Sequence, residues 1–408
     1  MKFVKKRKNI TVFSYPNVYW GAKGNSVYLD SIVRSLRDLG GSLSYLTCVG
    51  EGGAAKIDFG HFLEPYETVR VMGRHRWAGR AYAVDPRVWL RAITRRWQRR
   101  HQRLRQGEQS PRIPWSLPTP PDATVRWMAA KVTEAQADIA VSNYFNLADV
   151  FAFLPAEIRK VVVVHDVMAL RHRSLELAGL PTDFDEGMIA REAEGFRAAD
   201  VCIAIQEDEA SYIRTIAPHT QVIVVPHGVE VPDYDLEAER SPVVVFVGAD
   251  NGPNRDGLSW LLEVIWPQVV RRHATARLRV VGAVARTYSK PWPQRAEAVG
   301  VVPDVHVEYA NAAVAVVPLR YGSGLKTKLV EALAAGLPVV ATASGAFGVD
   351  EVPADVVAVR DQPCHFASAV TEFLTSATAS RDRAAARATA CRHYSHRRNV
   401  ERLRALLA

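Results

Sequence analysis

The sequence is poor in cysteine and has no long uninterrupted apolar stretch. Its four cysteines lack the spacing of metal ligands, so we expect reduced, mostly buried thiols at Cys48, Cys202, Cys364 and Cys391. No run approaches the roughly 18 apolar residues of a membrane-spanning helix, and no 20–50-residue repeat indicates a solenoid. The basic first residues precede only a short apolar run without a cleavage site, so we expect no signal peptide and a cytoplasmic protein.

Acidic residues are missing from one stretch, residues 87–105, which contains eight arginines. This stretch carries +8 of the net charge of +9, so the basic character of the chain is local. Tryptophans and aliphatic residues recur within it at helical spacing, which is typical of a helix on an anionic membrane surface. Two alternatives remain: a solvated helix whose tryptophans pack on the domain, and a nucleic acid contact, for which no recognition motif is present. We expect a membrane or acceptor surface and no nucleic acid, with the surface formed by Trp89, Arg95, Arg96, Trp97, Arg99 and Arg100.

The length and the order of apolar runs predict an α/β protein of two domains. Short β-branched runs alternate with longer amphipathic segments, which is the pattern of βαβ units and a parallel sheet. In the first half we expect strands at Ile10–Phe13, Leu43–Cys48, Ile139–Ser142, Val161–Val164, Val201–Ile205 and Val222–Val225. The pattern then restarts, with strands expected at Val243–Val247, Leu278–Val281, Val314–Val317, Val339–Ala341 and Val356–Val359.

The best candidate for the linker between the halves is Gly228–Ser241, which has mixed charges and no periodicity. We therefore expect one Rossmann-like domain over residues 1–227 and a second over residues 228–394. We expect a final helix within residues 395–408 to pack back on the first domain. The first helix of the second domain is expected at Pro253–Arg272 with Asn254 as its cap.

A glycine-containing loop in the second half has the features of a phosphate site. Gly322 and Gly324 follow an expected strand and precede an expected helix, whose free amides and dipole attract an anion. Lys326 and Lys328 add positive charge there, and Glu331 follows within the helix. An ordinary turn explains the glycines alone, but the whole group predicts a cradle for a diphosphate.

This stretch, Pro318–Thr342, with Gly-Ser-Gly, two lysines, Glu-Ala and Gly-Leu-Pro-Val-Val-Ala, resembles the donor-site signature of glycosyltransferase family 4. Two further stretches, Val225–Val229 and Val245–Gly248, resemble the interdomain element of that family and the first strand and turn of its second domain. The resemblance implies the GT-B fold: two Rossmann-like domains whose parallel sheets face each other across a cleft. It is diffuse over the first 200 residues.

The resemblance also implies roles for individual residues of the second half. Glu331 is expected on the ribose hydroxyls of the donor, and backbone groups near Val302 are expected to read the base. Where the family's first glutamate contacts the transferred sugar, this chain has Ser323. The paired cations of the family are represented only by Arg255, offset from their usual place, so Lys326 is expected to neutralise part of the leaving diphosphate. The expected donor site is completed by Gly248, Gly324, Leu325 and Thr327.

In the first half the resemblance points to a loop and a histidine. The loop after the first expected strand ends at Gly24 and Asn25, which are expected to reach the diphosphate from across the cleft. His165 directly follows a strand, at the position of a functional histidine that contacts the donor sugar. Asp166 is expected either to orient His165 or to cap the next helix. Asp183-Phe-Asp185 matches a metal motif of another fold, but it precedes an expected helix, so we expect helix capping and no metal.

The resemblance implies transfer of a sugar from a nucleoside diphosphate sugar to a hydroxyl, with retention of configuration and without metal or cofactor. The acceptor is expected to be a sugar or a lipid-linked sugar, as in the synthesis of cell-surface polysaccharide. Two alternatives remain open: a nucleotide-sugar epimerase of the same fold, which needs a pair of acid and base carboxylates, and a basic membrane or nucleic acid binder without catalysis. The latter leaves the segment Gly322–Glu331 unexplained.

Overall fold

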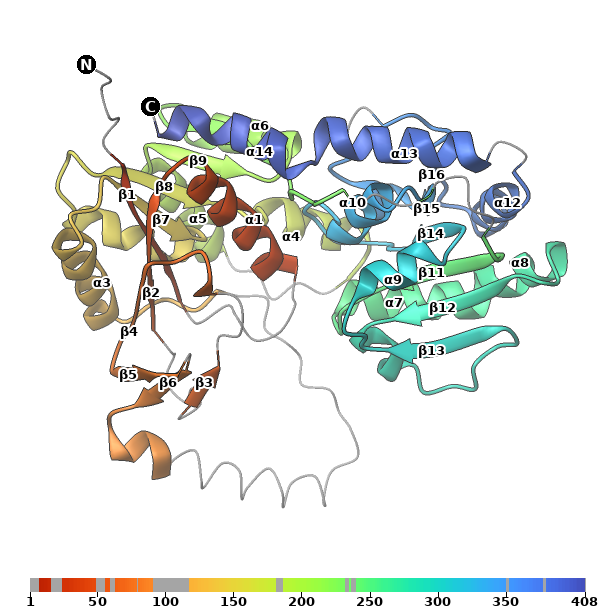
Figure 1. Cartoon of the computed structure of the whole chain (residues 1–408), viewed down its shortest axis with the longest axis horizontal. Helices are drawn as coiled ribbons and strands as arrows, with labels where there is room; N and C mark the ends of the chain where they lie inside the picture. The colour runs from red at the N-terminus through yellow and green to blue at the C-terminus, as the bar shows by residue number, and fades with distance from the viewer. Residues whose placement is uncertain are drawn as a thin grey trace.

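The fold is that of a two-lobed α/β protein (Figure 1). The computed structural model describes residues 7–15, 24–48, 56–58, 63–78, 80–90, 117–180, 186–231, 235, 240–349, 352–376 and 379–407. Each lobe is built around its own sheet, and α13 (Ala379–His393) and α14 (His396–Leu403) run along one side of the two lobes.

The first lobe contains a seven-stranded parallel sheet. Its central strands, 9–14, 139–143, 159–163 and 201–204, are mostly apolar and buried because helices cover both faces, whereas the edge strand 221–224 has no fully buried side chain. The predicted strands of this half are confirmed to within one or two residues at their ends. In spatial order the sheet consists of β10 (Gln221–Val224), β9 (Val201–Ala204), β8 (Arg159–Val163), β7 (Ile139–Asn143), β1 (Asn9–Ser14), β2 (Ser42–Thr47) and β4 (Thr68–Val71).

The second lobe contains a six-stranded parallel sheet, and its predicted strands are confirmed as well. Its order is β13 (Ala296–Gly300), β12 (Arg277–Val281), β11 (Val243–Val247), β14 (Val314–Val317), β15 (Val339–Ala341) and β16 (Val357–Val359). Strand order reverses beside β11, and in such sheets ligands bind beyond the carboxyl ends of the strands at the point of reversal. The two parallel sheets confirm the predicted fold class.

Sequence reasoning missed a small antiparallel sheet in the first lobe. It contains β3 (Lys56–Asp58), β6 (Arg80–Ala83) and β5 (Arg74–Trp77) in that order. Its strands are three or four residues long and rich in arginine, so they give no apolar run to detect. They leave Trp77 72% exposed.

The helices of the first lobe include α1 (Gly24–Asp38), α3 (Asp122–Glu134), α4 (Met168–Leu177), α5 (Glu186–Arg197) and α6 (Glu207–Ile216), with a 3₁₀ segment, η2 (Phe145–Phe153). Those of the second lobe include α7 (Gly252–Trp260), α8 (Trp266–Arg272), α9 (Val305–Ala310), α10 (Thr327–Ala334), α11 (Ala343–Ala346) and α12 (Pro363–Leu374), with short segments η3 (Leu261–Ile265), η4 (Ala283–Thr287) and η5 (Arg404–Leu406). Among the described residues, no helix combines the length and apolarity required to cross a membrane.

Three predictions were wrong in detail: the uninterrupted helix over Pro253–Arg272, its cap, and the burial of two cysteines. The helix expected over Pro253–Arg272 is divided by a π-helical turn, because Pro267 lacks an amide hydrogen and its ring displaces the carbonyl one turn before it. The cap is Asn251, whose side chain accepts from the Asn254 amide at 3.0 Å, rather than Asn254 itself. Of the four cysteines, all free, Cys364 and Cys391 are exposed rather than buried.

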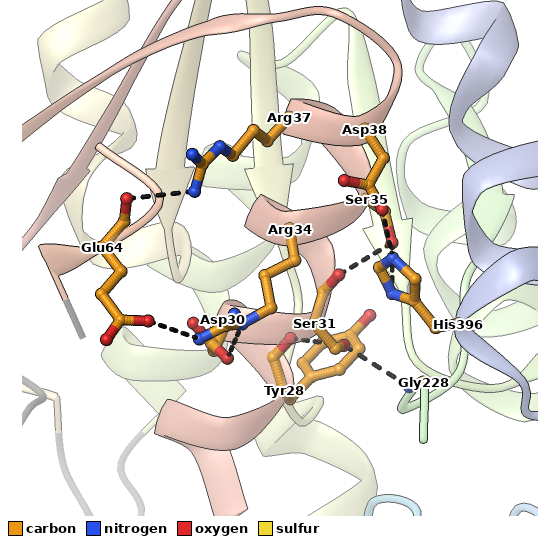
Figure 2. Close-up of polar contacts among 10 residues, drawn as sticks. All are labelled: Tyr28, Asp30, Ser31, Arg34, Ser35, Arg37, Asp38, Glu64, Gly228 and His396. Carbon is orange, nitrogen blue, oxygen red and sulfur yellow. Dashed lines mark hydrogen bonds and ion pairs between the residues drawn. The ribbon is translucent and has the colours of Figure 1, made fainter. Parts of the chain in front are cut away.

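The chain crosses between the lobes twice, and the two crossings lie side by side. Val229 and Ser395 form a parallel bridge, with the Val229 amide donating to the Tyr394 carbonyl at 2.8 Å. Helix α1 holds both crossings, as Figure 2 shows: Ser31 contacts the Gly228 amide, and His396 contacts Asp38. The last helix thus returns to the first lobe.

Candidate donor site

The loop between β14 and α10 brings backbone amides to the carboxyl edge of the second sheet. Gly322 and Gly324 have φ angles of +118° and +72°, which are unfavourable for residues with a side chain. A Cβ atom at Gly324 would lie 3.3 Å from the His165 carbonyl oxygen of the first lobe. In the first turn of α10, which begins at Thr327, the Leu329 amide already donates to the Lys326 carbonyl at 2.8 Å. The loop therefore lies at the start of α10 and next to the first lobe, and its role as a phosphate site stays a prediction.

Lys326 precedes α10 and clamps this loop. Its ammonium donates to the Ser323 carbonyl at 2.9 Å and to the Gly324 carbonyl at 2.6 Å. Burial lowers the pKa of Lys326 to about 8, an effect that Asp166 opposes. An ammonium in such surroundings gains strongly from a nearby anion, because little water screens the interaction.

Lys328 and Glu331 lie further along α10, on the side of the second lobe. The Lys328 ammonium donates to the side-chain oxygen of Asn254 and lies 4.9 Å from the centre of the Phe246 ring. Burial lowers the pKa of Lys328 to about 7, and the Lys326 charge contributes to the decrease. Burial also raises the pKa of Glu331, whose carboxylate accepts from the Tyr309 hydroxyl at 3.3 Å.

The remaining second-lobe candidates surround the same edge. Gly248 follows β11 and packs so tightly that an added Cβ would lie 2.9 Å from Val284 Cγ1. Arg255 forms an ion pair with Asp250 at 2.5 Å. Val302 is partly buried between β13 and α9. Leu325 is buried and Thr327 is the first residue of α10.

His165 lies two residues beyond β8, at the carboxyl end of the first sheet, as expected. Its Nε2 contacts the Asn143 side-chain oxygen at 2.5 Å, and its ring stacks on Tyr144 with 4.3 Å between ring centres. Burial lowers the pKa of His165 to about 3, so the ring is neutral at physiological pH. A neutral imidazole can donate to or accept from a sugar hydroxyl but brings no positive charge.

Asp166 neither orients His165 through a recorded hydrogen bond nor caps α4; it contacts the second lobe. It accepts from the Ser323 hydroxyl at 2.6 Å and forms an ion pair with Arg171. The side chain that meets the amides at the start of α4 is Glu192 of α5, at 2.7 Å from the Met168 nitrogen. Burial raises the pKa of Glu192 to about 8.

Sequence reasoning missed Arg171 and Ser174, both on α4. Arg171 Nε lies 3.4 Å from the Ser323 hydroxyl, and the Gly322 amide donates to Ser174 at 3.2 Å. A first-lobe helix thus rests on the glycine loop of the second lobe. An arginine and a serine within an ordinary helix give no local signal of such a contact.

Several candidates cannot be placed in the site. Gly24 and Asn25 begin α1, while the preceding loop, residues 16–23, lies outside the described residues. Trp89 is 40% exposed and its indole donates to the Ala83 carbonyl at 2.9 Å. Outside the described residues lie Asp183, Asp185, Arg95, Arg96, Trp97, Arg99 and Arg100. In the described part of the chain, no group of three His, Cys, Asp or Glu side chains is arranged to hold a metal ion.

Residues 241–376 match the family model described as Glycosyl transferases group 1. This range contains the glycine loop, α10 and the surrounding second-lobe candidates. A search among curated proteins finds no match.

Solved structures with the same fold cover almost the whole chain. TarM of S. aureus, in a complex that contains UDP, is similar with a TM-score of 0.65 at 10% identity over 98% of this chain and 99% of that one. Sucrose-phosphate synthase of Thermosynechococcus elongatus gives 0.66 at 16% identity over 98% of both chains. HepE of Anabaena, in complex with UDP-glucose, gives 0.62 at 14% identity over 98% and 99%. The shared architecture is the GT-B fold.

Proposed function

We propose that this chain, a glycosyltransferase with the GT-B fold and a group 1 domain in its second lobe, transfers a sugar from a nucleoside diphosphate sugar to a hydroxyl acceptor. The observation that carries the proposal is the loop Gly322–Gly324, which lies between β14 and the start of α10 and has the buried Lys326 ammonium beside it. UDP-sugars are the first donors to test, because similar structures contain UDP or UDP-glucose.

In this proposal the second domain, residues 228–394, binds the donor and the first, residues 1–227, binds the acceptor. The diphosphate lies on the loop of Ser323 and Gly324, and the carboxylate of Glu331 receives the ribose hydroxyls. His165 contacts the sugar from the other lobe. We propose that transfer proceeds with retention and without a metal or cofactor. The charge of the leaving diphosphate is then neutralised by fixed amides and by Lys326.

The binding step can be tested by titration calorimetry with UDP, GDP and ADP. We expect one of the three nucleoside diphosphates to bind with micromolar affinity in the presence of EDTA. From the sugar donor that contains this nucleotide, the enzyme should release the nucleoside diphosphate faster when an acceptor is added. A protein that binds none of the three contradicts the proposal. Interconversion of sugars on the intact donor, without an acceptor, would instead favour the epimerase.

We also propose that the enzyme works on a lipid-linked or cell-surface polysaccharide intermediate at an anionic membrane, through the basic segment that includes Trp89 and Arg95. Sedimentation with neutral vesicles and with vesicles containing phosphatidylglycerol tests this. We expect binding only to the anionic vesicles, weakened several-fold by salt. Replacing Arg95, Arg96, Arg99 and Arg100 by glutamine should remove it, and unchanged binding would contradict a membrane role for the segment.

A further inference from the structure

A tyrosine beside His165 has a backbone conformation that is normally reserved for glycine. Tyr144 directly follows β7 and has φ and ψ angles of +76° and 163°. Residues other than glycine keep such strain only where the surrounding structure imposes it, which is frequent at ligand sites. Two hydrogen bonds impose it here: the Tyr144 amide donates to the Val163 carbonyl at 3.1 Å, and the Ser142 hydroxyl donates to the Tyr144 carbonyl at 2.7 Å. The fold therefore maintains a strained residue at the carboxyl end of β7.

The strained residue stacks its ring on His165. The two ring centres lie 4.3 Å apart, with 23° between the ring planes. Tyr28 of α1 contacts the same imidazole edge-on, with 5.2 Å between ring centres and 87° between the planes. Tyr28 is itself fixed, because it is buried and its hydroxyl donates to the Val225 carbonyl at 2.7 Å. Two aromatic neighbours thus hold the plane of the His165 ring.

Asn143, the last residue of β7, determines which nitrogen of His165 carries the proton. Asn143 is 0% exposed, and its side-chain oxygen lies 2.5 Å from His165 Nε2. An amide oxygen can only accept, so Nε2 is the protonated nitrogen. Burial lowers the pKa of His165 to about 3, so the ring has no second proton at physiological pH. Nδ1 is therefore an acceptor.

This acceptor is buried and has no hydrogen-bond donor among the residues that the structure describes. Only 8% of the His165 surface is exposed, and buried polar atoms of native proteins are nearly always paired. His165 adjoins the glycine loop, since its carbonyl oxygen lies 3.3 Å from the position of a Cβ atom at Gly324. A donor on that loop would bring its sugar close to His165, and a sugar hydroxyl can donate to Nδ1.

We propose that Asn143 and Tyr144 are positioning residues of the sugar site: together they hold His165 in one plane as the Nε2–H tautomer, so that Nδ1 accepts a hydrogen bond from a hydroxyl of the transferred sugar. This inference deepens the proposed function and rests on it. Both residues act through His165 and need not touch the donor. The arrangement favours a sugar with a hydroxyl at the contacted position over its deoxy analogue.

The tautomer can be measured without a donor. In protein labelled with ¹⁵N at its histidines, the shifts of the two ring nitrogens show which one is protonated, and His165→Gln identifies the signals of His165. At pH 8 we expect the proton on Nε2 in the wild type. Asn143→Leu removes the acceptor and should shift the ring toward the Nδ1–H form, whereas Asn143→Asp keeps an acceptor and should retain the wild-type tautomer. A wild-type ring protonated on Nδ1 overturns the inference.

The effect on the donor is measured by calorimetry with UDP and UDP-glucose. UDP lacks the transferable sugar and is the internal reference. Asn143→Leu should lower the affinity for UDP-glucose about three- to tenfold, the usual effect of losing one neutral hydrogen bond, and should leave the affinity for UDP unchanged. Thr220→Val removes a buried hydrogen bond to the Phe196 carbonyl at the amino end of the same sheet. It is the matched control and should change neither affinity.

The outcomes separate the inference from the function on which it rests. An equal loss for both ligands, or no loss for UDP-glucose, contradicts the inference alone. If the wild type prefers GDP or ADP, then GDP-glucose or ADP-glucose takes the place of UDP-glucose. A wild type that binds none of the three nucleoside diphosphates contradicts the proposed function, whatever the tautomer of His165.

The strain at Tyr144 has a test of its own. Tyr144→Ala and Tyr144→Gly both remove the ring, but only glycine accepts the φ angle of +76° without strain. We therefore expect Tyr144→Gly to melt at a higher temperature than Tyr144→Ala, the reverse of the order in an ordinary strand or helix. Both variants should weaken binding of UDP-glucose as Asn143→Leu does. The opposite melting order, or wild-type affinity in both variants, shows that Tyr144 is not a positioning residue.

Discussion

The two lobes meet at the glycine loop with polar groups that are supplied in different ways. The second-lobe wall offers backbone amides and the ammonium of Lys326, all within one short stretch of chain. The first-lobe wall offers buried acidic side chains, Asp166, Glu192 and Glu209, which come from three separate elements. Asp166 is ion-paired with Arg171, and burial raises the pKa of Glu192 to about 8. The second-lobe wall, called here the positive wall, is the one proposed to bind a diphosphate, whereas Asp166 of the first-lobe wall already has a counter-charge in Arg171. The groups proposed to bind the substrate therefore lie close together in the sequence, whereas the groups that face them come from separate elements.

The strongest test of this comparison removes the cation of the positive wall. We expect Lys326→Ala to lower kcat by about 10²–10³-fold, the usual loss when one stabiliser of a developing charge is removed. Initial rates with saturating donor measure it. Lys290→Ala, an exposed lysine paired with Glu263, is the control and should retain full activity. Turnover of Lys326→Ala within twofold of wild type would assign charge stabilisation elsewhere.

The second test changes the first-lobe wall at Asp166, which contacts Ser323 of the loop. Asp166→Asn keeps an acceptor for Ser323 but leaves Arg171 without its carboxylate. We expect the KM for the donor to rise about tenfold, equivalent to about 1.4 kcal/mol. The reason is that loss of the Asp166 charge should shift the Arg171 guanidinium and with it the position of the adjoining loop. Asp149→Asn, with an exposed side chain on η2, serves as the control. An unchanged KM would show that the contact only closes the lobes.

The smallest expected effect is on the free energy of unfolding and concerns His227, next to the first crossing between the lobes. Burial lowers the pKa of His227 to about 4, and of His165 to about 3, from an ordinary value of 6.5. Below pH 6.5 the unfolded chain gains protons that the folded chain does not, so each histidine costs stability as pH falls toward its folded pKa. The slope is up to about 1.4 kcal/mol per pH unit for each group.

His227→Gln should therefore reduce the pH dependence of stability between pH 6.5 and pH 4 by about one proton, as measured by chemical denaturation. The raised pKa of Glu192 acts in the opposite direction, because stability is lost as pH rises from 4.5 through about 8. That effect is common to both proteins and cancels in the difference. His219→Gln changes an exposed histidine and is the control. Equal slopes for wild type and His227→Gln would contradict the buried neutral state.

The positive wall could be predicted from sequence because it is local. Gly322 through Glu331 are contiguous, and strand, turn and helix follow from hydrophobic pattern and glycine alone. The first-lobe side of the contact could not, because Arg171, Glu192 and Glu209 lie in helices whose role appears only when the lobes are packed together. Likewise, the strands of β3, β5 and β6 are too short and too polar to show a period.

The side-by-side crossings at Val229 and Ser395 have a consequence for engineering. The chain leaves the first lobe and returns to it at neighbouring points, so the segment between them is inserted as a cassette. Exchanging that cassette for one from another enzyme requires two junctions that lie beside each other on α1. A chimaera spliced here also has to keep the contacts of Ser174 and Asp166 with the glycine loop.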